Sequence, residues 1–184
     1  RLEMMRLRES DNHIRRIKAI HRRLRVPRNY IQRGLPVYRD ASELVHVPCG
    51  LNGALRPMSP TTHRQFLSMQ TAAAKDGISL MVRWAFRSTD DQVHLIREQV
   101  SISRNSIEDL LSWIAAPGHS EHHTGQALDF ECIPADAQFE ETPAFAWLNQ
   151  NAERYGFRLS YPRNNAYGII YEPWHWYCYS EDVS

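Results

Sequence analysis

Two short stretches of the chain contain residue types that bind metal ions and move protons. Residues 117–129 contain three histidines and two acids, and residues 171–176 contain Glu172 and His175. Two imidazoles and a carboxylate are a usual ligand set for a catalytic zinc ion, which keeps one position open for water. A second carboxylate beside that water can act as a general base. Together the stretches predict one catalytic zinc site.

Chemistry alone leaves the assignment of these residues open. His119 and His123 compete with His122 for the metal, and sequence spacing does not exclude either of them. Asp129 lies within an apolar segment, where a carboxylate needs a partner because burial of a lone charge is costly. A bound metal ion would be such a partner for the carboxylate of Asp129. Glu172 could instead bind the metal, with Asp129 as the base.

Three motifs resemble one known family. Residues 120–129 read Ser-x-His-x-x-Gly-x-Ala-x-Asp, residues 172–176 read Glu-Pro-Trp-His-Trp, and residues 86–88 read Phe-Arg-Ser with Gln92 five places after the arginine. This pattern resembles the zinc D-alanyl-D-alanine carboxypeptidases of the VanY type, which are related to lysostaphin-like peptidases and the hedgehog signalling domain. The motifs follow the family's order over roughly the C-terminal two-thirds of the chain.

The resemblance implies a role for each residue. It implies that His122, Asp129 and His175 bind a single zinc ion and that Glu172 is the catalytic base. It further implies that Arg87, Gln92 and Ser120 bind the terminal carboxylate of the substrate.

Arg87 also has a chemical argument of its own. A carboxypeptidase must recognise a free carboxylate, and a planar guanidinium binds one with two hydrogen bonds. The alternative is a structural salt bridge from Arg87 to a local acid such as Asp90. The sequence departs from the family pattern at Thr89, Ser160 and Tyr177, which could alter substrate preference.

The resemblance therefore predicts a zinc carboxypeptidase that removes the C-terminal D-alanine from peptidoglycan stem peptides or muropeptides, as a D,D- or an L,D-carboxypeptidase. One alternative is a peptidoglycan endopeptidase of the same fold, which would not need Arg87 to hold a terminal carboxylate. A second is a non-catalytic zinc-containing binding module, against which Glu172 argues. Action on the cell wall fits the periplasm or cell envelope, and a cytoplasmic role in wall recycling is the alternative.

Composition is that of a globular domain. The 184 residues are 42% hydrophobic and 23% charged, which suits one domain with a core of its own. No run is long and apolar enough for a transmembrane segment. Three cysteines leave at least one thiol unpaired within a monomer, which argues against a disulfide scaffold. Oligomeric state is not predicted.

The charge is distributed unevenly. Residues 1–28 contain ten Lys/Arg and three Asp/Glu, whereas the remainder contains twelve against eighteen, so +7 and −6 give the net +1. We interpret residues 1–27 as a basic N-terminal helix or arm and residues 28–184 as the zinc carboxypeptidase domain. The arm lacks the interleaved aromatic residues that stack on bases, so nucleic acid is not expected as a partner.

Periodicity and punctuation predict the elements that position the motifs. Helices are expected at 1–25, 60–76, 106–115 and 143–155, and a further helix begins after a cap at Ser88 or Thr89. Ser59-Pro60 and Thr142-Pro143 are expected to begin the helices at 60–76 and 143–155, and the helix at 1–25 has an apolar stripe that includes Leu7, Ile17 and Ile20. Strands are expected at 44–47, 78–86, 125–132, 157–161, 167–171 and 174–179. Alternation places Val82 and Trp84 on the same inward face of the strand at 78–86, and it places Asp129 and Leu128 on different faces of theirs. Long helices precede clustered strands, which favours an α+β fold. The resemblance implies the same class: a small central antiparallel sheet carries the metal site on one face, and helices pack on the other, as in hedgehog and D-Ala-D-Ala peptidase-like folds.

Overall fold

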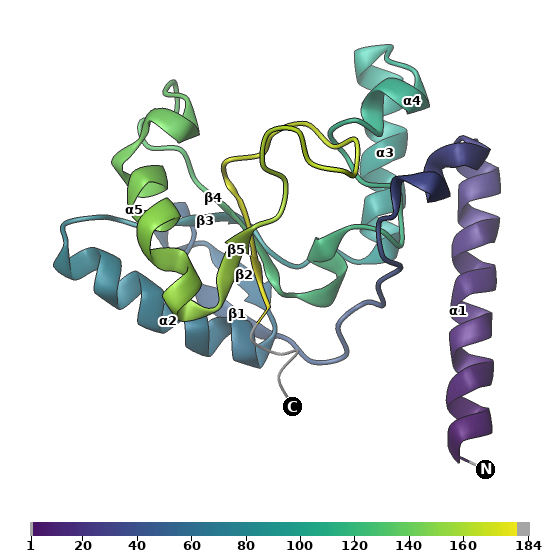
Figure 1. Cartoon of the computed structure of the whole chain (residues 1–184), viewed down its shortest axis with the longest axis horizontal. Coiled ribbons are helices and arrows are strands. Elements are labelled where there is room, and N and C mark those ends of the chain that lie inside the picture. Colours follow the sequence, from purple (N-terminus) through teal and green to yellow (C-terminus); the bar gives the residue numbers. More distant parts are fainter. Residues whose placement is uncertain (1, 180–184) are drawn as a thin grey trace.

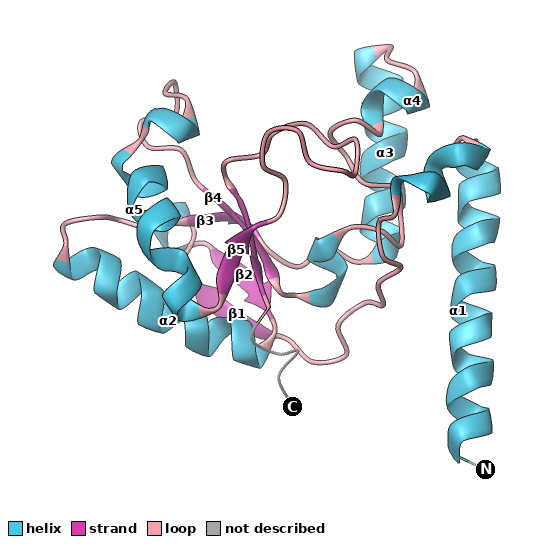
Figure 2. Cartoon of the chain, in the orientation of Figure 1, coloured by secondary structure: helices cyan, strands magenta, loops and turns pink. Residues whose placement is uncertain are grey.

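The chain folds into helices and short strands that are interspersed along its length (Figures 1 and 2). The computed structural model describes residues 2–179, with side chains described from residue 9 onward. The described elements are α1 (Leu2–Leu24), β1 (Val45–Pro48), β2 (Leu55–Met58), α2 (Pro60–Lys75), β3 (Val82–Trp84), α3 (Thr89–Ser103), α4 (Ile107–Leu110), β4 (Ala127–Phe130), α5 (Pro143–Asn151), β5 (Phe157–Leu159) and β6 (His175–Cys178).

The central sheet has four antiparallel strands in the order β3-β4-β6-β5, and β1 and β2 form a separate antiparallel pair. Helices α2 and α5 cover one face of the central sheet, where Phe66, Met69 and Leu148 join Leu128 and Trp176 in the main core. Side chains alternate between the faces of a strand, so Asp129 points away from this core. The predicted α+β class with an antiparallel sheet is confirmed.

Capping residues begin the helices where the sequence predicts. Ser59 and Thr142 accept hydrogen bonds from backbone N–H groups of α2 and α5, and each is followed by a proline in the first turn. Ser88 forms a reciprocal capping box with Asp91 at the start of α3. Local chemistry therefore sets these boundaries, including the one directly after Arg87.

The strand predicted at 78–86 is shorter than expected and irregular. β3 pairs with β4 only over Val82–Trp84, and its register shifts between Val82 and Trp84. A bulge of this kind places an extra residue on one strand, so side chains beyond it change faces. Trp84, predicted to share a buried face with Val82, is 56% exposed, while Ala85 is buried. The alternation prediction was wrong beyond residue 83.

The strand predicted at 167–171 is absent. Its backbone makes other hydrogen bonds: the N–H of Ile170 donates to the carbonyl of Ser112 at 2.7 Å, and the N–H of Glu172 donates to that of Tyr161 at 3.1 Å. Ile169 is buried in a second core cluster beside α3 and α4. The predicted helix at 106–115 is likewise shorter, because α4 ends at Leu110 and turns follow it.

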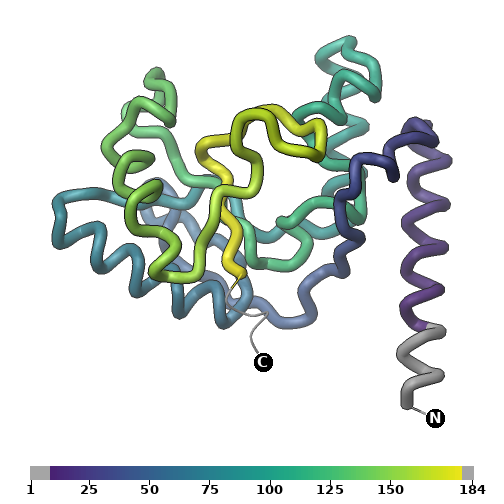
Figure 3. The backbone as a smooth tube through the Cα atoms, in the orientation of Figure 1, coloured from purple at the N-terminus to yellow at the C-terminus, as the bar shows by residue number. Residues whose placement is uncertain are grey.

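Helix α1 stands at one side of the molecule (Figure 3). Ile17 and Ile20 of its predicted apolar stripe are buried, whereas the side chain of Leu7, also assigned to that stripe, lies outside the described residues. A Cβ on Gly118 would lie 2.7 Å from Cδ1 of Ile17, so α1 packs closely on the segment that leads to the first metal motif. No helix among residues 2–179 combines the length and apolarity needed to cross a membrane.

Two histidines join α1 to that segment. His21 Nε2–H donates to the carbonyl of Pro117 at 2.8 Å, and His119 Nδ1–H donates to that of Pro36 at 2.8 Å. Their ring centroids are 5.3 Å apart. Burial lowers the pKa of His21, and burial with the neighbouring His21 lowers the pKa of His119. Both rings are therefore held neutral.

This pairing predicts that the metal-free protein loses stability in acid. Both histidines have pKa values below the ordinary 6.5 in the folded chain, so the unfolded chain binds more protons as the pH falls below about 6.5 and folding is penalised. Each histidine contributes a slope of at most ~1.4 kcal/mol per pH unit. Urea unfolding with a chelator at several pH values measures it. His21→Gln should flatten the slope, and exposed His46→Gln should leave it unchanged; an equal slope in all three proteins would contradict the assignment.

Candidate metal centre

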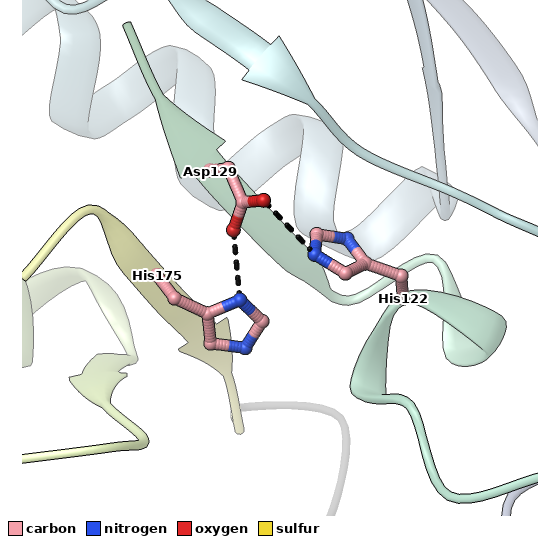
Figure 4. A group of neighbouring side chains, drawn as sticks. All are labelled: His122, Asp129 and His175. Atoms are coloured by element: carbon pink, nitrogen blue, oxygen red, sulfur yellow. Dashed lines mark hydrogen bonds and ion pairs between the residues drawn. The ribbon is translucent and has the colours of Figure 1, made fainter. Parts of the chain in front are cut away.

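Strand pairing brings one acid and one histidine face to face. Asp129 on β4 lies directly opposite His175 on β6 in the antiparallel register. Asp129 Oδ1 is 2.8 Å from His175 Nδ1 (Figure 4). Directly opposed residues of an antiparallel pair hold their Cβ atoms about 4.5–5.5 Å apart, so the register itself produces the contact.

The second histidine comes from a short turn. Ser120 caps a 3-10 turn over Glu121–Thr124, its Oγ accepts from the N–H of His122, and Gly125 ends the turn with φ +70°. A Cβ on Gly125 would lie 3.0 Å from the backbone nitrogen of Ser59, so glycine fits both the left-handed conformation and the close approach. The turn places His122 Nε2 3.2 Å from Asp129 Oδ2.

His122, Asp129 and His175 thus form a compact donor set. One donor atom from each lies within 4.8 Å of the others, and no other group of three or more metal-binding side chains occurs among residues 9–179. Metal-bound histidines usually donate their second ring N–H to a carboxylate or carbonyl. Here His122 Nδ1 lies 2.6 Å from the carbonyl oxygen of Ala85, and His175 Nε2 lies 2.9 Å from Glu121 Oε2. The donor set and its supporting acceptors fit a zinc ion.

The competing histidines have other partners. His123 Nε2 accepts from the N–H of Gly118 at 3.0 Å, and its Nδ1–H donates to the carbonyl of Arg87 at 2.7 Å. His119 is bound to the carbonyl of Pro36 and lies against His21. Both rings therefore hold the loop, and neither joins the three-residue group.

Charge in the metal-free centre is concentrated on the pair of Asp129 and His175. Burial alone would raise the pKa of Asp129, but the two imidazoles hold it far below its ordinary value. Burial would lower the pKa of His175, yet hydrogen bonds with Asp129 and Glu121 raise it well above 6.5. The acid is therefore ionised, which is the state that a metal ligand requires.

Glu172 lies at the edge of this group without joining it. Its Oε2 is 3.9 Å from His175 Nδ1, and its side chain is 12% exposed. Burial raises the pKa of Glu172 to about 7, with His175 opposing the shift. A carboxyl group with its pKa near neutrality can both accept and return a proton. The residue predicted as the base is thus placed beside the donor set.

Arg87 approaches the same centre from the start of α3. Its N–H donates to the carbonyl of His122 at 3.1 Å, its guanidinium Nε donates to Gln92 Oε1, and Asp129 and Glu172 lie close enough to favour its charge. The alternative salt bridge to Asp90 is not formed: Asp90 pairs with Arg16 at 2.8 Å. Gln92 is fully buried, and its Nε2 donates to the carbonyl of Ala115 at 2.7 Å.

A pocket of about 460 Å³ opens onto the centre, a volume typical of small-ligand sites. Its polar wall contains Arg87, Ser120, Glu172 and the three donor residues, and its apolar wall contains Trp84, Trp113, Phe139, Tyr161 and Trp174. Trp84 reaches this wall because of the bulge in β3. The pocket therefore brings together the guanidinium of Arg87, the carboxyl group of Glu172 with its pKa of about 7, and the metal donor set.

One residue of the centre was not singled out from the sequence. Glu121 is buried, and its Oε2 accepts hydrogen bonds from His175 Nε2 and from Ser160 Oγ, the latter at 2.5 Å. In the sequence, the one feature that pointed to Glu121 was its position between Ser120 and His122 in the first metal motif. The structure adds that this segment is buried. An acid beside a metal ligand is a candidate for its support, but no spacing rule links residue 121 to residue 175.

Comparison with known proteins identifies a family. The family model described as VanY, D-alanyl-D-alanine carboxypeptidase, matches residues 56–181. A D-alanyl-D-alanine carboxypeptidase of Enterococcus faecalis is 31% identical over 114 residues, which cover 57% of this chain and 42% of the relative. The chain spans about two fifths of the length of the curated relatives it matches first.

Solved structures agree with the sequence matches. VanYB in complex with D-alanine-D-alanine is 28% identical, with a TM-score of 0.63 over 80% of this chain and 83% of that one. A point mutant of the vancomycin-resistance D,D-pentapeptidase VanY in complex with Zn(II) is 27% identical, with a TM-score of 0.62 over 78% of this chain and 82% of that one. The residues that the family model matches, 56–181, include the three donor residues, Glu172 and Arg87.

Proposed function

Because this chain belongs to the VanY family of D-alanyl-D-alanine carboxypeptidases, we propose that it is a zinc-dependent carboxypeptidase that removes the C-terminal D-alanine from peptidoglycan stem peptides. The observation that carries the proposal is the shared pocket: the donor set, Glu172 and Arg87 all line it. Metal, base and carboxylate receptor are the three parts that such a hydrolysis needs.

His122, Asp129 and His175 would hold one zinc ion. Two imidazoles and a carboxylate leave a coordination position open, and a VanY structure contains Zn(II). When bound, zinc would supply Lewis acidity, lowering the pKa of water to about 7 and polarising the scissile carbonyl.

Glu172 would act on the proton of the attacking water. The water oxygen bonds to the carbonyl carbon while Glu172 takes its proton, and Glu172 then returns a proton to the amide nitrogen as the C–N bond breaks. The products are free D-alanine and the shortened peptide. Residue 173 is proline, which restricts the backbone of Glu172 to extended conformations and thereby limits where the carboxylate can move.

Arg87 would receive the terminal carboxylate of the substrate. Its Nε is occupied by Gln92, which leaves the two terminal nitrogens for a bidentate contact. Gln92, fully buried, would act on the substrate by holding this guanidinium, and Ser120 would contribute from the pocket wall. This use of Arg87 favours a carboxypeptidase over an endopeptidase, and Glu172 beside the donor set argues against a non-catalytic zinc-containing module.

The test is mass spectrometry of stem pentapeptides and tetrapeptides incubated with the zinc-loaded protein, with and without a chelator. Loss of one alanine from the pentapeptide identifies D,D-carboxypeptidase activity, and loss from the tetrapeptide identifies L,D-carboxypeptidase activity. Internal cleavage identifies the endopeptidase, and intact peptides contradict the proposal.

The compartment follows from the substrate. A protein that acts on the cell wall would encounter it in the periplasm or cell envelope, or in the cytoplasm during wall recycling.

Replacing Arg87 should weaken cleavage of free acids selectively. Hydrogen bonds to charged groups contribute about 1.5–3 kcal/mol each. For a pentapeptide with a free C-terminal carboxylate, the kcat/KM of Arg87→Ala should therefore fall about 10–100-fold. The same peptide with an amidated C-terminus should show little change. Arg87→Lys is the matched variant, since it keeps the charge without the planar pair of donors. Equal losses on acid and amide would show that Arg87 does not recognise the carboxylate.

A further inference from the structure

A buried acid supports the metal donor set from behind. Glu121 directly precedes His122, and its side chain is 8% exposed. Its Oε2 lies 2.9 Å from His175 Nε2 and 2.5 Å from Ser160 Oγ. Ionised carboxylates are expensive to bury without partners. Among residues 9–179, whose side chains the structure describes, Glu121 pairs with His175 and with no lysine or arginine, so its partners are the imidazole and the hydroxyl of Ser160.

The geometry divides the two nitrogens of His175 between two acids. Nδ1 lies 2.8 Å from Asp129 Oδ1 on the pocket side, and Nε2 lies 2.9 Å from Glu121 Oε2 on the opposite side. The same Oε2 accepts the hydroxyl proton of Ser160, and an oxygen that accepts from Ser160 has no proton to give to His175, so the nitrogen facing Glu121 carries the proton. A histidine that binds a metal ion is neutral, and with the Nε2 proton held by Glu121 the proton that His175 loses on binding comes from Nδ1. The lone pair of the ligand would then lie on Nδ1, which faces Asp129.

Ser160 fixes the orientation of Glu121. Its hydroxyl has one proton to donate, and that proton is directed at the same Oε2 that accepts from His175. Ser160 follows β5 directly, whereas His175 begins β6 and Glu121 belongs to the 3-10 turn. The chain of hydrogen bonds therefore links three separate segments at one carboxylate oxygen.

We propose that Glu121 is a positioning residue for the zinc site: it holds His175 as the Nε2–H tautomer with Nδ1 presented to the ion, and Ser160 holds Glu121 in place. The inference rests on the proposed function, because it needs zinc at the donor set. It adds that this site is built from four segments and that residue 160, where the chain departs from the family pattern, tunes metal affinity. Outer partners of this kind commonly change metal affinity about 10–100-fold.

Zinc affinity provides the main test. The full chain is stripped with a chelator and titrated with zinc against a chromophoric competitor. Glu121→Ala should weaken zinc binding about 10–100-fold. Glu121→Gln, whose amide oxygen still accepts a hydrogen bond, should recover part of the loss. Ser160→Ala should weaken binding by a smaller factor without removing a buried charge. Glu141→Gln, at an exposed acid, should bind zinc as the parent does.

A spectroscopic readout separates positioning from general damage. In the zinc-loaded parent, the His175 Nε2–H proton should give a downfield NMR signal that exchanges slowly with water. The signal should be lost in Glu121→Ala and retained in Glu121→Gln. Parent-like zinc affinity in both Glu121→Ala and Ser160→Ala would overturn the inference while leaving the proposed function intact. A parent protein that binds no zinc at all would overturn both.

Discussion

Replacing Glu172 by glutamine is expected to abolish most hydrolysis while zinc remains bound. The substitution keeps the size of the side chain and removes its ability to take a proton. General-base catalysis typically contributes about 10²–10⁴-fold, so kcat for a stem peptide should fall by that factor. Zinc stoichiometry should stay at one ion per chain, because Glu172 lies outside the compact donor set and 3.9 Å from His175 Nδ1.

The control for this variant is Glu98→Gln, which makes the same change at an exposed position of α3. It should leave both kcat and zinc content unchanged. Activity of Glu172→Gln within a few-fold of the parent would remove Glu172 from the mechanism. Loss of zinc together with activity would instead show that Glu172 is a ligand, the exchange of roles with Asp129 that the sequence left open.

Replacing Asp129 by asparagine is expected to remove zinc and activity together. Asp129 is the only acid of the donor set, and its two oxygens contact both imidazoles, at 3.2 Å to His122 and 2.8 Å to His175. Asparagine fills the same space without the charge that attracts the ion. Zinc affinity should fall by more than the about 10–100-fold that outer partners produce, and hydrolysis should become undetectable at low zinc concentration.

Two controls define this result. Chelator treatment of the parent should reproduce the loss of hydrolysis, and added zinc should restore it. Asp136→Asn, at an exposed acid, should bind zinc normally. An Asp129→Asn protein that retains one tightly bound zinc ion would contradict the donor set. Urea unfolding of the metal-free proteins would show whether the variant still folds.

Predictions from short-range chemistry agreed best with the structure. Ser59 and Thr142 cap their helices as predicted, and of the two candidates Ser88 and Thr89 it is Ser88 that caps α3. These predictions hold because the N–H donors that a cap binds lie within three residues of it. Alternation along β4 also predicted that Asp129 lies on the face of the strand away from the core residue Leu128, and the structure agrees. These patterns depend on neighbours in sequence, which a single chain shows directly.

Predictions that depended on distant partners were less accurate. The bulge in β3 moved Trp84 from the expected core to the pocket wall, because a bulge is decided by how two strands pair. Residues 167–171 formed no strand, since Ser112 supplied a hydrogen-bond acceptor from another part of the chain. The division into residues 1–27 and 28–184 stays a prediction, although Ile17 packs on the segment before the metal motif.

The sequence by itself determined which residue types this protein brings to its centre and, through three ordered motifs, the family to which it belongs. It could not show that residues 129 and 175 face each other across a sheet, because strand register is a property of the folded pair. Nor could it show which of three histidines turns toward that pair, or that Glu121 and Ser160 stand behind it. The tertiary structure decided these points, because hydrogen-bond partners far apart in the chain fix the direction of each ring.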